Sequence, residues 1–175
     1  ARALAARAGP ARATLDIVDL GCGTGLCGVE IRPLAQRLVG CDLSTGMLLQ
    51  ARRRALYDEL YKVELLHFLR HEPGRFDALV SADTLCYFGA LDDVAMAAAN
   101  ALRPGGCFVF TVEALEPRAG QHRLQPSGRY AHAREHLLKV LSVAQFDAVD
   151  CQAAVLRQEA GQPVAGWVVT ATRCA

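Results

Sequence analysis

Short apolar segments alternate with segments of helical periodicity along most of the chain. Branched residues dominate the apolar segments, which predicts five buried strands, at 15–20, 38–41, 61–65, 76–82 and 107–112. Apolar positions recur at helical spacing between them, which predicts helices at 26–38, 45–58 and 91–102, with Ser44 or Thr45 capping the second. Strands that alternate with helices form a parallel sheet, because parallel neighbours need a long crossover.

The C-terminal part of the chain departs from this alternation. Segment 114–129 is polar and predicts a long loop, and segment 131–144 resumes helical spacing. The strand-like segments 147–158 and 165–172 follow with no helix between them, so they must pair in antiparallel orientation. We therefore predict an α/β fold with a doubly wound, mostly parallel seven-stranded sheet and a C-terminal antiparallel hairpin.

Length, charge and cysteine content narrow the class of protein. Residues 1–175 suffice for one hydrophobic core, so we expect a single domain, and the start without Met suggests the C-terminal part of a longer chain. A net charge of +1 gives no reason to expect nucleic acid or a membrane as partner. The seven cysteines show no metal-ligand spacing, and no apolar stretch approaches the ~20 residues of a membrane span. We predict a cytoplasmic protein without a metal site.

A glycine-rich segment with the sequence DLGCGTGLCG follows the first predicted strand, at 19–28. Glycines permit a tight turn and close backbone approach to a ligand, and the next helix supplies unpaired N–H groups, as nucleotide-like ligands require. Residues 23–28 match G-x-G-x-x-G, and Asp42 ends the second strand where an acid can accept hydrogen bonds from ribose hydroxyls. The pattern predicts an adenosine cofactor and leaves its class open.

The same residues resemble the class I S-adenosylmethionine (SAM)-dependent methyltransferases. Segment 18–25, VDLGCGTG, is similar to the first motif of that family, with an acid two residues before three alternate glycines. The fourth strand and the LRPGG turn before the fifth resemble later motifs, and the C-terminal antiparallel pair fits the family's last two strands. The resemblance covers about 15–172, and segments 83–88 and 127–132 are similar to a bacterial subgroup often linked to tetratricopeptide repeats.

This resemblance implies roles for individual residues. Asp19 would orient the methionine ammonium of SAM, Asp42 would hold the ribose, and Glu64, where the family usually has Asp, would meet the adenine. Asp83 would be a general base or acceptor-site residue, with a helix N-cap as the alternative, and Tyr87 would wall the transfer pocket with Phe88. The predicted catalytic residues are Asp83 and Tyr87, and the predicted cofactor contacts are Asp19, Gly21, Cys22, Gly23, Gly25, Asp42, Leu43, Glu64, Leu65 and Ala82.

The implied reaction is transfer of the SAM methyl group to an O, N, S or C nucleophile, leaving S-adenosylhomocysteine. In-line displacement without metal suffices, because the sulfonium methyl is already activated. The acceptor would be a small molecule or a protein, and an N-terminal repeat domain is expected in the full-length chain. Two alternatives remain: an NAD(P)-dependent oxidoreductase, which the glycines and Asp42 also fit, and a non-catalytic SAM-binding or partner-binding module.

Polar residues gather around the predicted long loop. An arginine fork there could clamp a carboxylate or phosphate of the acceptor, but we favour a solvated loop. The residues concerned are His122, Arg123, Arg129, Tyr130 and His132. The remaining histidines, His67, His71 and His136, are predicted to be surface or helix-face residues.

Overall fold

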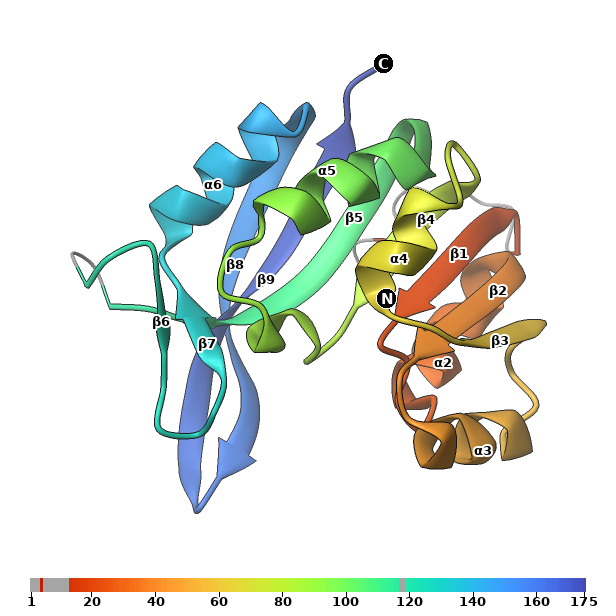
Figure 1. Cartoon of the computed structure of the whole chain (residues 1–175), viewed down its shortest axis with the longest axis horizontal. Helices are drawn as coiled ribbons and strands as arrows, with labels where there is room; N and C mark the ends of the chain where they lie inside the picture. Colours follow the sequence, from red (N-terminus) through yellow and green to blue (C-terminus); the bar gives the residue numbers. More distant parts are fainter. Residues whose placement is uncertain (1–3, 5–12, 117–118) are drawn as a thin grey trace.

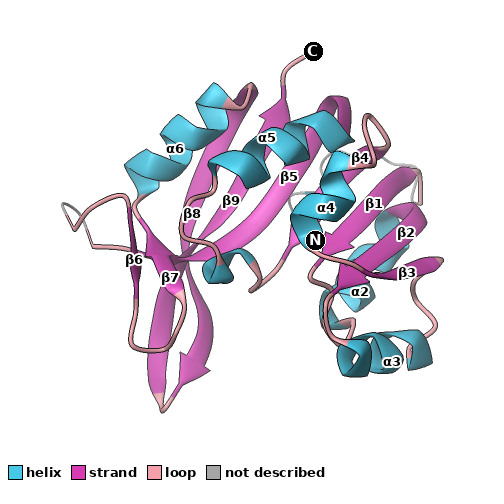
Figure 2. Cartoon of the chain, viewed as in Figure 1, coloured by secondary structure: helices cyan, strands magenta, loops and turns pink. Residues whose placement is uncertain are grey.

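The fold consists of one mixed β-sheet with helices on both faces (Figures 1 and 2). The computed structural model describes Leu4, residues 13–116 and residues 119–175. In chain order, the described elements are β1 (Leu15–Leu20), α2 (Leu26–Ile31), the 3₁₀ turn η1 (Arg32–Leu34), β2 (Ala35–Asp42), α3 (Thr45–Arg53), β3 (Glu59–Lys62), α4 (Leu65–Arg70), β4 (Phe76–Ser81), the 3₁₀ turn η2 (Leu85–Tyr87), α5 (Asp92–Ala101), β5 (Leu102–Ala114), β6 (His122–Leu124), β7 (Tyr130–His132), α6 (Arg134–Val143), β8 (Phe146–Glu159) and β9 (Gln162–Arg173).

The strand order confirms the predicted doubly wound α/β class. Strands β3, β2, β1, β4 and β5 lie side by side in that order, and each neighbouring pair is parallel. Strand β9 continues the sheet antiparallel to β5, and β8 pairs antiparallel with β9. The sequence therefore predicted the existence of these seven strands and of the closing hairpin correctly, although the bounds of the third strand differ.

Both faces of the central strands are buried, as parallel sheets require. Along β1, Val18 and Leu20 pack into the core beneath α4, α5 and α6, whereas Ile17 packs on the opposite face with Ile31 of α2. Figure 1 shows α4, α5 and α6 over the same face of the sheet. None of the helices in the described part of the chain is long and apolar enough to cross a bilayer.

The helix predicted at 26–38 is shorter than expected. It ends at Ile31, and η1 with Pro33 in its first turn redirects the chain into β2 from Ala35. Proline in a helix interior removes a backbone donor and clashes with the preceding turn, which explains the early stop. The helix predicted at 45–58 likewise ends at Arg53, and Ala55 then adopts a left-handed φ of 54°.

The third strand and its neighbourhood differ from the prediction. Strand β3 occupies Glu59–Lys62 instead of 61–65, and the sequence analysis missed helix α4 altogether. Leu65, Phe68 and Leu69 are buried at helical spacing, a signal too short to be separated from a strand.

The segment predicted as a long loop contains two further strands. Strand β7 pairs parallel with the end of β5 and antiparallel with β6, so the sheet in the described residues has nine strands instead of seven. Helix α6 begins at Arg134 because Tyr130–His132 is drawn into the sheet. Pairing across a polar hairpin leaves little trace in hydrophobic periodicity, so the sequence pattern indicated a loop.

Candidate active site

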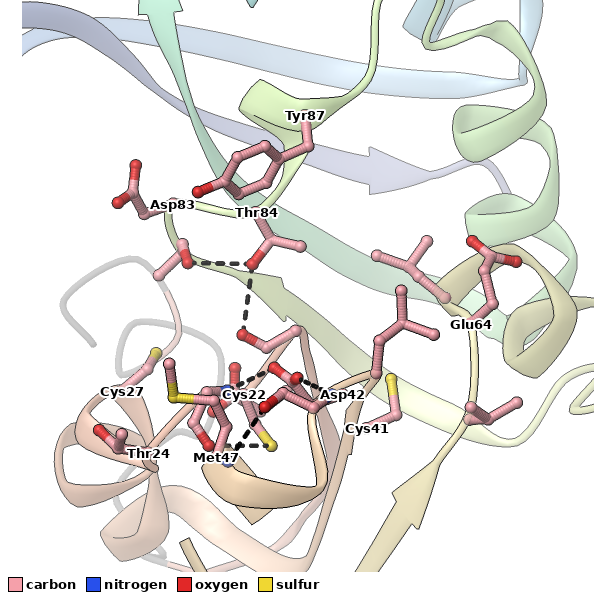
Figure 3. A pocket seen from close by; sticks show the side chains of 18 of the residues that line it. Cys22, Thr24, Cys27, Cys41, Asp42, Met47, Glu64, Asp83, Thr84 and Tyr87 are labelled. Atoms are coloured by element: carbon pink, nitrogen blue, oxygen red, sulfur yellow. Dashed lines mark hydrogen bonds between the residues drawn. The ribbon is translucent and has the colours of Figure 1, made fainter. Parts of the chain in front are cut away.

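A pocket of about 880 Å³ lies at the carboxyl ends of β1, β2 and β4, the edge at which open parallel sheets bind ligands (Figure 3). All the predicted site residues except Gly25 line it, namely Asp19, Gly21, Cys22, Gly23, Asp42, Leu43, Glu64, Leu65, Ala82, Asp83 and Tyr87. Phe88, expected as a wall, lines it as well. Eight further residues line the pocket without having been predicted from the sequence, namely Thr24, Leu26, Cys27, Cys41, Ser44, Met47, Val63 and Thr84. Most of these adjoin a predicted residue in sequence, which is the signal that would have found them.

The glycine loop turns tightly between β1 and α2. Gly21 adopts a φ of 69°, and its N–H and that of Cys22 both donate to the Cys41 carbonyl, at 2.9 and 3.0 Å. A Cβ on Gly21 would lie 2.8 Å from the Thr84 Cβ, so the loop after β4 also requires glycine here. Gly25 lies outside the pocket and opens α2 in the left-handed conformation at φ 82°, so its part is to shape the turn.

Asp42 joins the glycine loop to the start of α3. Its Oδ2 accepts from the Gly23 N–H at 2.9 Å, and its Oδ1 accepts from the Ser44 N–H at 2.7 Å. A carboxylate has about four lone-pair sites, so each oxygen can accept a second hydrogen bond. The two backbone contacts therefore hold the carboxylate in place and leave capacity for a pair of ligand hydroxyls.

Asp19 is buried at the end of β1, with 1% of its surface exposed. Its Oδ2 accepts from the Tyr57 hydroxyl at 2.6 Å, whereas its Oδ1 has no hydrogen-bond partner among the described residues. Burial raises the pKa of Asp19 to about 6, the Tyr57 hydrogen bond opposes this rise, and the nearby Asp42 carboxylate adds to it. A buried carboxylate oxygen without a partner is costly, and a cationic ligand group in the pocket would satisfy it.

Glu64 stands at the beginning of α4 as its N-cap. Its two carboxylate oxygens accept from the Leu66 and His67 N–H groups, at 2.9 and 2.8 Å. The helix that the sequence analysis missed therefore begins at a predicted cofactor residue, and Leu65 follows as its first helical residue. The cap fixes the Glu64 carboxylate, and Val63, Glu64 and Leu65 all line the pocket.

Asp83 and Tyr87 lie across the pocket from Asp42 and Met47 (Figure 3). The helix-cap alternative for Asp83 is wrong, because Thr84 holds the N-cap position of η2. The Asp83 carboxylate instead accepts from Arg157 of β8 at 2.9 Å, and its backbone N–H donates to the Thr111 hydroxyl.

The two arginines beside Asp83 and Tyr87, Arg157 and Arg129, are engaged with protein groups. Arg157 also pairs with Glu159 at 3.0 Å and with the buried carboxylate of Glu113. Arg129 lies over the Tyr87 ring, 5.8 Å from its centroid, and contacts Glu159 at 3.4 Å. Neither arginine lines the pocket; each instead contacts a residue that does, Arg157 the Asp83 carboxylate and Arg129 the Tyr87 ring.

The structure contradicts the predicted solvated loop at one of the histidines assigned to it, His132. His132 is fully buried, and His136, predicted to lie on the surface or on a helix face, lies on α6 and is only 9% exposed. Their rings approach that of His122 with centroid separations of 6.0 and 5.8 Å. Burial lowers the pKa of His132 to about 4, helped by repulsion from its two histidine neighbours. His67 and His71 are exposed, as predicted.

The cysteines in the pocket are neutral thiols. All seven cysteines are free, and burial raises the pKa of Cys27 and of Cys41 to about 12 and that of Cys22 further still. They act as small apolar groups that shape the pocket. In the ranges that the structure covers, no cluster of three or more His, Cys, Asp or Glu side chains is placed to hold a metal ion.

Comparison of the sequence with known proteins identifies relatives among methyltransferases. The biotin biosynthesis bifunctional protein BioHC of Saccharophagus degradans is 36% identical over 101 residues, which are 54% of this chain and 18% of that protein. The malonyl-[acyl-carrier protein] O-methyltransferase of Enterobacter lignolyticus is 29% identical over 139 residues, 79% of this chain and 54% of that enzyme. The chain thus spans about half, or less, of the length of these relatives.

Comparison of the structure finds the same fold in solved proteins. An S-adenosylmethionine-dependent methyltransferase from Mesorhizobium loti superimposes with a TM-score of 0.71 at 24% identity, over 98% of this chain and 96% of its own. The [4+2]-cyclase SpnF superimposes with a TM-score of 0.78 at 19% identity, over 98% of this chain and 79% of its own. A family model described as a methyltransferase domain matches residues 18–108. The chain therefore belongs to the methyltransferase domain family, and its fold is that of the class I SAM-dependent methyltransferases.

Proposed function

We propose that this chain binds SAM and transfers its methyl group to a nucleophile. The observation that carries the proposal is the buried Asp19 carboxylate, which lines the glycine-loop pocket and whose Oδ1 has no partner in the part of the chain that the structure describes. SAM bears an ammonium that this oxygen can accept from and vicinal ribose hydroxyls that Asp42 can accept from. A nicotinamide dinucleotide would instead bring its pyrophosphate to the glycine loop, where the Asp19 carboxylate would repel it.

The other pocket residues fit the remaining parts of SAM. Gly21 and Gly23 would admit the methionine portion, and the segment around Glu64 and Leu65 would meet the adenine edge. Cys22, Leu43 and Ala82 would supply further contacts. The exposed apolar side chain of Leu43 would be buried by an aromatic base that packs against it. Apolar lining with a few fixed polar groups is typical of cofactor pockets.

The main catalytic task of the protein is to align the acceptor nucleophile with the methyl group of SAM. Bound SAM supplies an electrophilic methyl group on a sulfonium centre. We propose that Asp83 and Tyr87 face the acceptor, with Arg157 fixing the Asp83 carboxylate and Arg129 supporting the Tyr87 ring. Holding the acceptor in line with the methyl group and excluding water lowers the barrier without further catalytic groups.

We propose oxygen as the acceptor atom, because a relative that aligns with 79% of this chain is a malonyl-[acyl-carrier protein] O-methyltransferase. The segments 83–88 and 127–132 support membership of the bacterial subgroup linked to tetratricopeptide repeats. On that basis we also propose a cytoplasmic protein whose full-length chain carries an N-terminal repeat domain, with 1–175 as its methyltransferase domain and a small molecule or protein as acceptor.

Titration calorimetry of the purified chain with S-adenosylhomocysteine, NAD⁺ and NADP⁺ tests the cofactor. We expect micromolar binding of S-adenosylhomocysteine alone, and binding of a nicotinamide dinucleotide alone would overturn the proposal. Because the [4+2]-cyclase SpnF shares this fold, binding does not establish methyl transfer. Transfer of label from methyl-labelled SAM to a panel of hydroxyl and carboxylate acceptors tests catalysis. Binding without transfer to any acceptor would favour the non-catalytic alternative.

A further inference from the structure

Tyr57 contacts the glycine loop from outside the pocket and is absent from the predicted site. It lies in the short connection between α3 and β3, two residues after the left-handed Ala55. Its hydroxyl donates to Asp19 Oδ2 at 2.6 Å, a contact between residues 38 positions apart in sequence. A residue that does not line the pocket thus holds one of the two carboxylate oxygens of Asp19.

Glycines make the space that the Tyr57 ring occupies. A Cβ on Gly28 would overlap the Tyr57 hydroxyl and lie 2.7 Å from its Cζ, and a Cβ on Gly40 would lie 3.0 Å from its Cδ1. Both distances are shorter than ordinary van der Waals contact. The Tyr57 ring therefore explains why Gly28, the last glycine of the G-x-G-x-x-G match, has no side chain. Gly28 of α2, Gly40 of β2 and the Tyr57 ring are therefore sterically complementary.

We infer that Tyr57 is a positioning residue for cofactor binding: its hydroxyl engages Asp19 Oδ2 and leaves Oδ1 as the acceptor for the ligand's ammonium. The inference rests on the proposed function, since it assumes that the pocket takes SAM. Geometry supports it, because Asp19 is buried and the Tyr57 hydroxyl is the hydrogen-bond donor that the structure records for its carboxylate. Without the hydroxyl, neither carboxylate oxygen has a donor among the described residues, and no hydrogen bond then fixes the orientation of the Asp19 side chain.

The role of Tyr57 can be tested by measuring ligand affinity as a function of pH, because Asp19 changes charge in a range where the thiols around it and Tyr57 do not. Facing it are Asp42 and Cys41 from β2, Cys22 from the glycine loop and Cys27 from α2, besides Tyr57 itself. The pKa values of the three thiols and of Tyr57 are all raised, so these four groups stay neutral between pH 5 and pH 8. Asp19, with a pKa of about 6, changes charge in this range, and the Tyr57 hydrogen bond favours its charged form.

The test compares Tyr57→Phe with wild type by calorimetric titration from about pH 5 to about pH 8. The probes are S-adenosylhomocysteine, which carries the ammonium, and 5′-methylthioadenosine, which lacks the amino-acid portion. We expect Tyr57→Phe to weaken S-adenosylhomocysteine binding about ten-fold at pH 7 and to move its acidic loss of affinity to higher pH. Binding of 5′-methylthioadenosine should stay unchanged, since its contacts do not involve Asp19.

Tyr61→Phe is the matched control. Tyr61 also donates to a carboxylate, that of Glu59, but it lies on β3 outside the pocket, so its loss should change neither affinity nor pH profile. In an Asp19→Asn background, Tyr57→Phe should have no further effect on the pH profile. Thermal unfolding verifies that Tyr57→Phe, which keeps the ring between its glycines, still folds.

The outcomes separate this inference from the proposed function. If wild type binds S-adenosylhomocysteine and Tyr57→Phe binds it equally well with the same pH profile, Tyr57 has no positioning role. Equal weakening of both probes would assign Tyr57 to the fold of the glycine loop and likewise overturn the inference. If wild type binds neither probe, the proposed cofactor is wrong and the inference fails with it.

Discussion

Replacing Asp42 by alanine removes a carboxylate that holds two backbone groups and, in the proposed complex, two ribose hydroxyls. The Gly23 and Ser44 N–H groups lose their acceptor, but Gly23 is only half-buried and Ser44 is exposed, so water can replace it. The cost to folding should therefore be only about 1 kcal/mol. The variant should keep the fold and show its defect in ligand binding.

The expected loss of affinity follows from the hydrogen bonds that disappear. A hydrogen bond to a charged acceptor contributes about 1.5–3 kcal/mol, so two ribose contacts amount to about 3 kcal/mol at the low end. Because about 1.4 kcal/mol corresponds to a factor of ten, the Kd for S-adenosylhomocysteine should rise about 100-fold.

Titration calorimetry with S-adenosylhomocysteine measures this directly, and Asp58→Ala is the matched control. Asp58 also accepts from a backbone N–H, that of Leu38 at 2.7 Å, and pairs with Arg32 at 2.6 Å, but it lies outside the pocket. Asp58→Ala should cost similar stability and leave the Kd unchanged.

Two results would refute this reasoning. A folded Asp42→Ala variant with a Kd within about three-fold of wild type, about 0.6 kcal/mol, would remove Asp42 from the binding site. A rise in Kd that Asp58→Ala reproduces would attribute the effect to loss of stability in this part of the sheet.

Three further perturbations test other parts of the structure. Gly21→Ala places a methyl group at a φ of 69° and against Thr84 in the loop after β4. Gly74→Ala has a similar φ of 60°, but the structure places no described atom within 4 Å of the added methyl group, so Gly21→Ala should destabilise the protein more. Chemical denaturation of both variants should show a difference in the free energy of unfolding above about 1 kcal/mol. Arg157→Met leaves the buried Glu113 carboxylate without its partner and should cost about 3 kcal/mol in urea denaturation, whereas a loss below about 0.5 kcal/mol would mean that the ion pair contributes little. His132 has a pKa of about 4 when folded against 6.5 when exposed, so the unfolded chain takes up its proton first and stability is lost as pH falls from 6.5 to 4. His132→Phe should remove about 3 kcal/mol of the wild-type decrease between pH 7 and pH 4, and identical slopes for both proteins would contradict the buried, neutral state of this residue.

Much of the pocket could be predicted from sequence because its parts are local. The turn after β1 needs residues that tolerate left-handed φ values, and Gly21, Gly23 and Gly25 have them. Asp42 ends a strand adjacent to that turn, and parallel neighbours bring their carboxyl ends to one edge. Predicted in this way, the loop and the acid needed no knowledge of distant contacts.

Other features depended on contacts that the hydrophobic pattern does not record. Helix α4 spans six residues and begins at a glutamate cap, so its periodicity is too short to be distinguished from a strand. The β6–β7 hairpin is polar and is held by pairing with the end of β5. His136 is predicted on the surface or on a helix face, whereas in the structure it is buried, with the His122 ring of the hairpin 5.8 Å away between centroids.

The sequence by itself determined the strand and helix alternation, the glycine turn and the acid that follows the second strand, because each follows from the preferences of neighbouring residues. Only the tertiary structure decided which side chains support them. Tyr57 reaches Asp19 across 38 positions, and Arg157 reaches Asp83 across 74. Such pairings arise when the sheet brings distant segments together, and burial then sets the charge and orientation of the groups that meet.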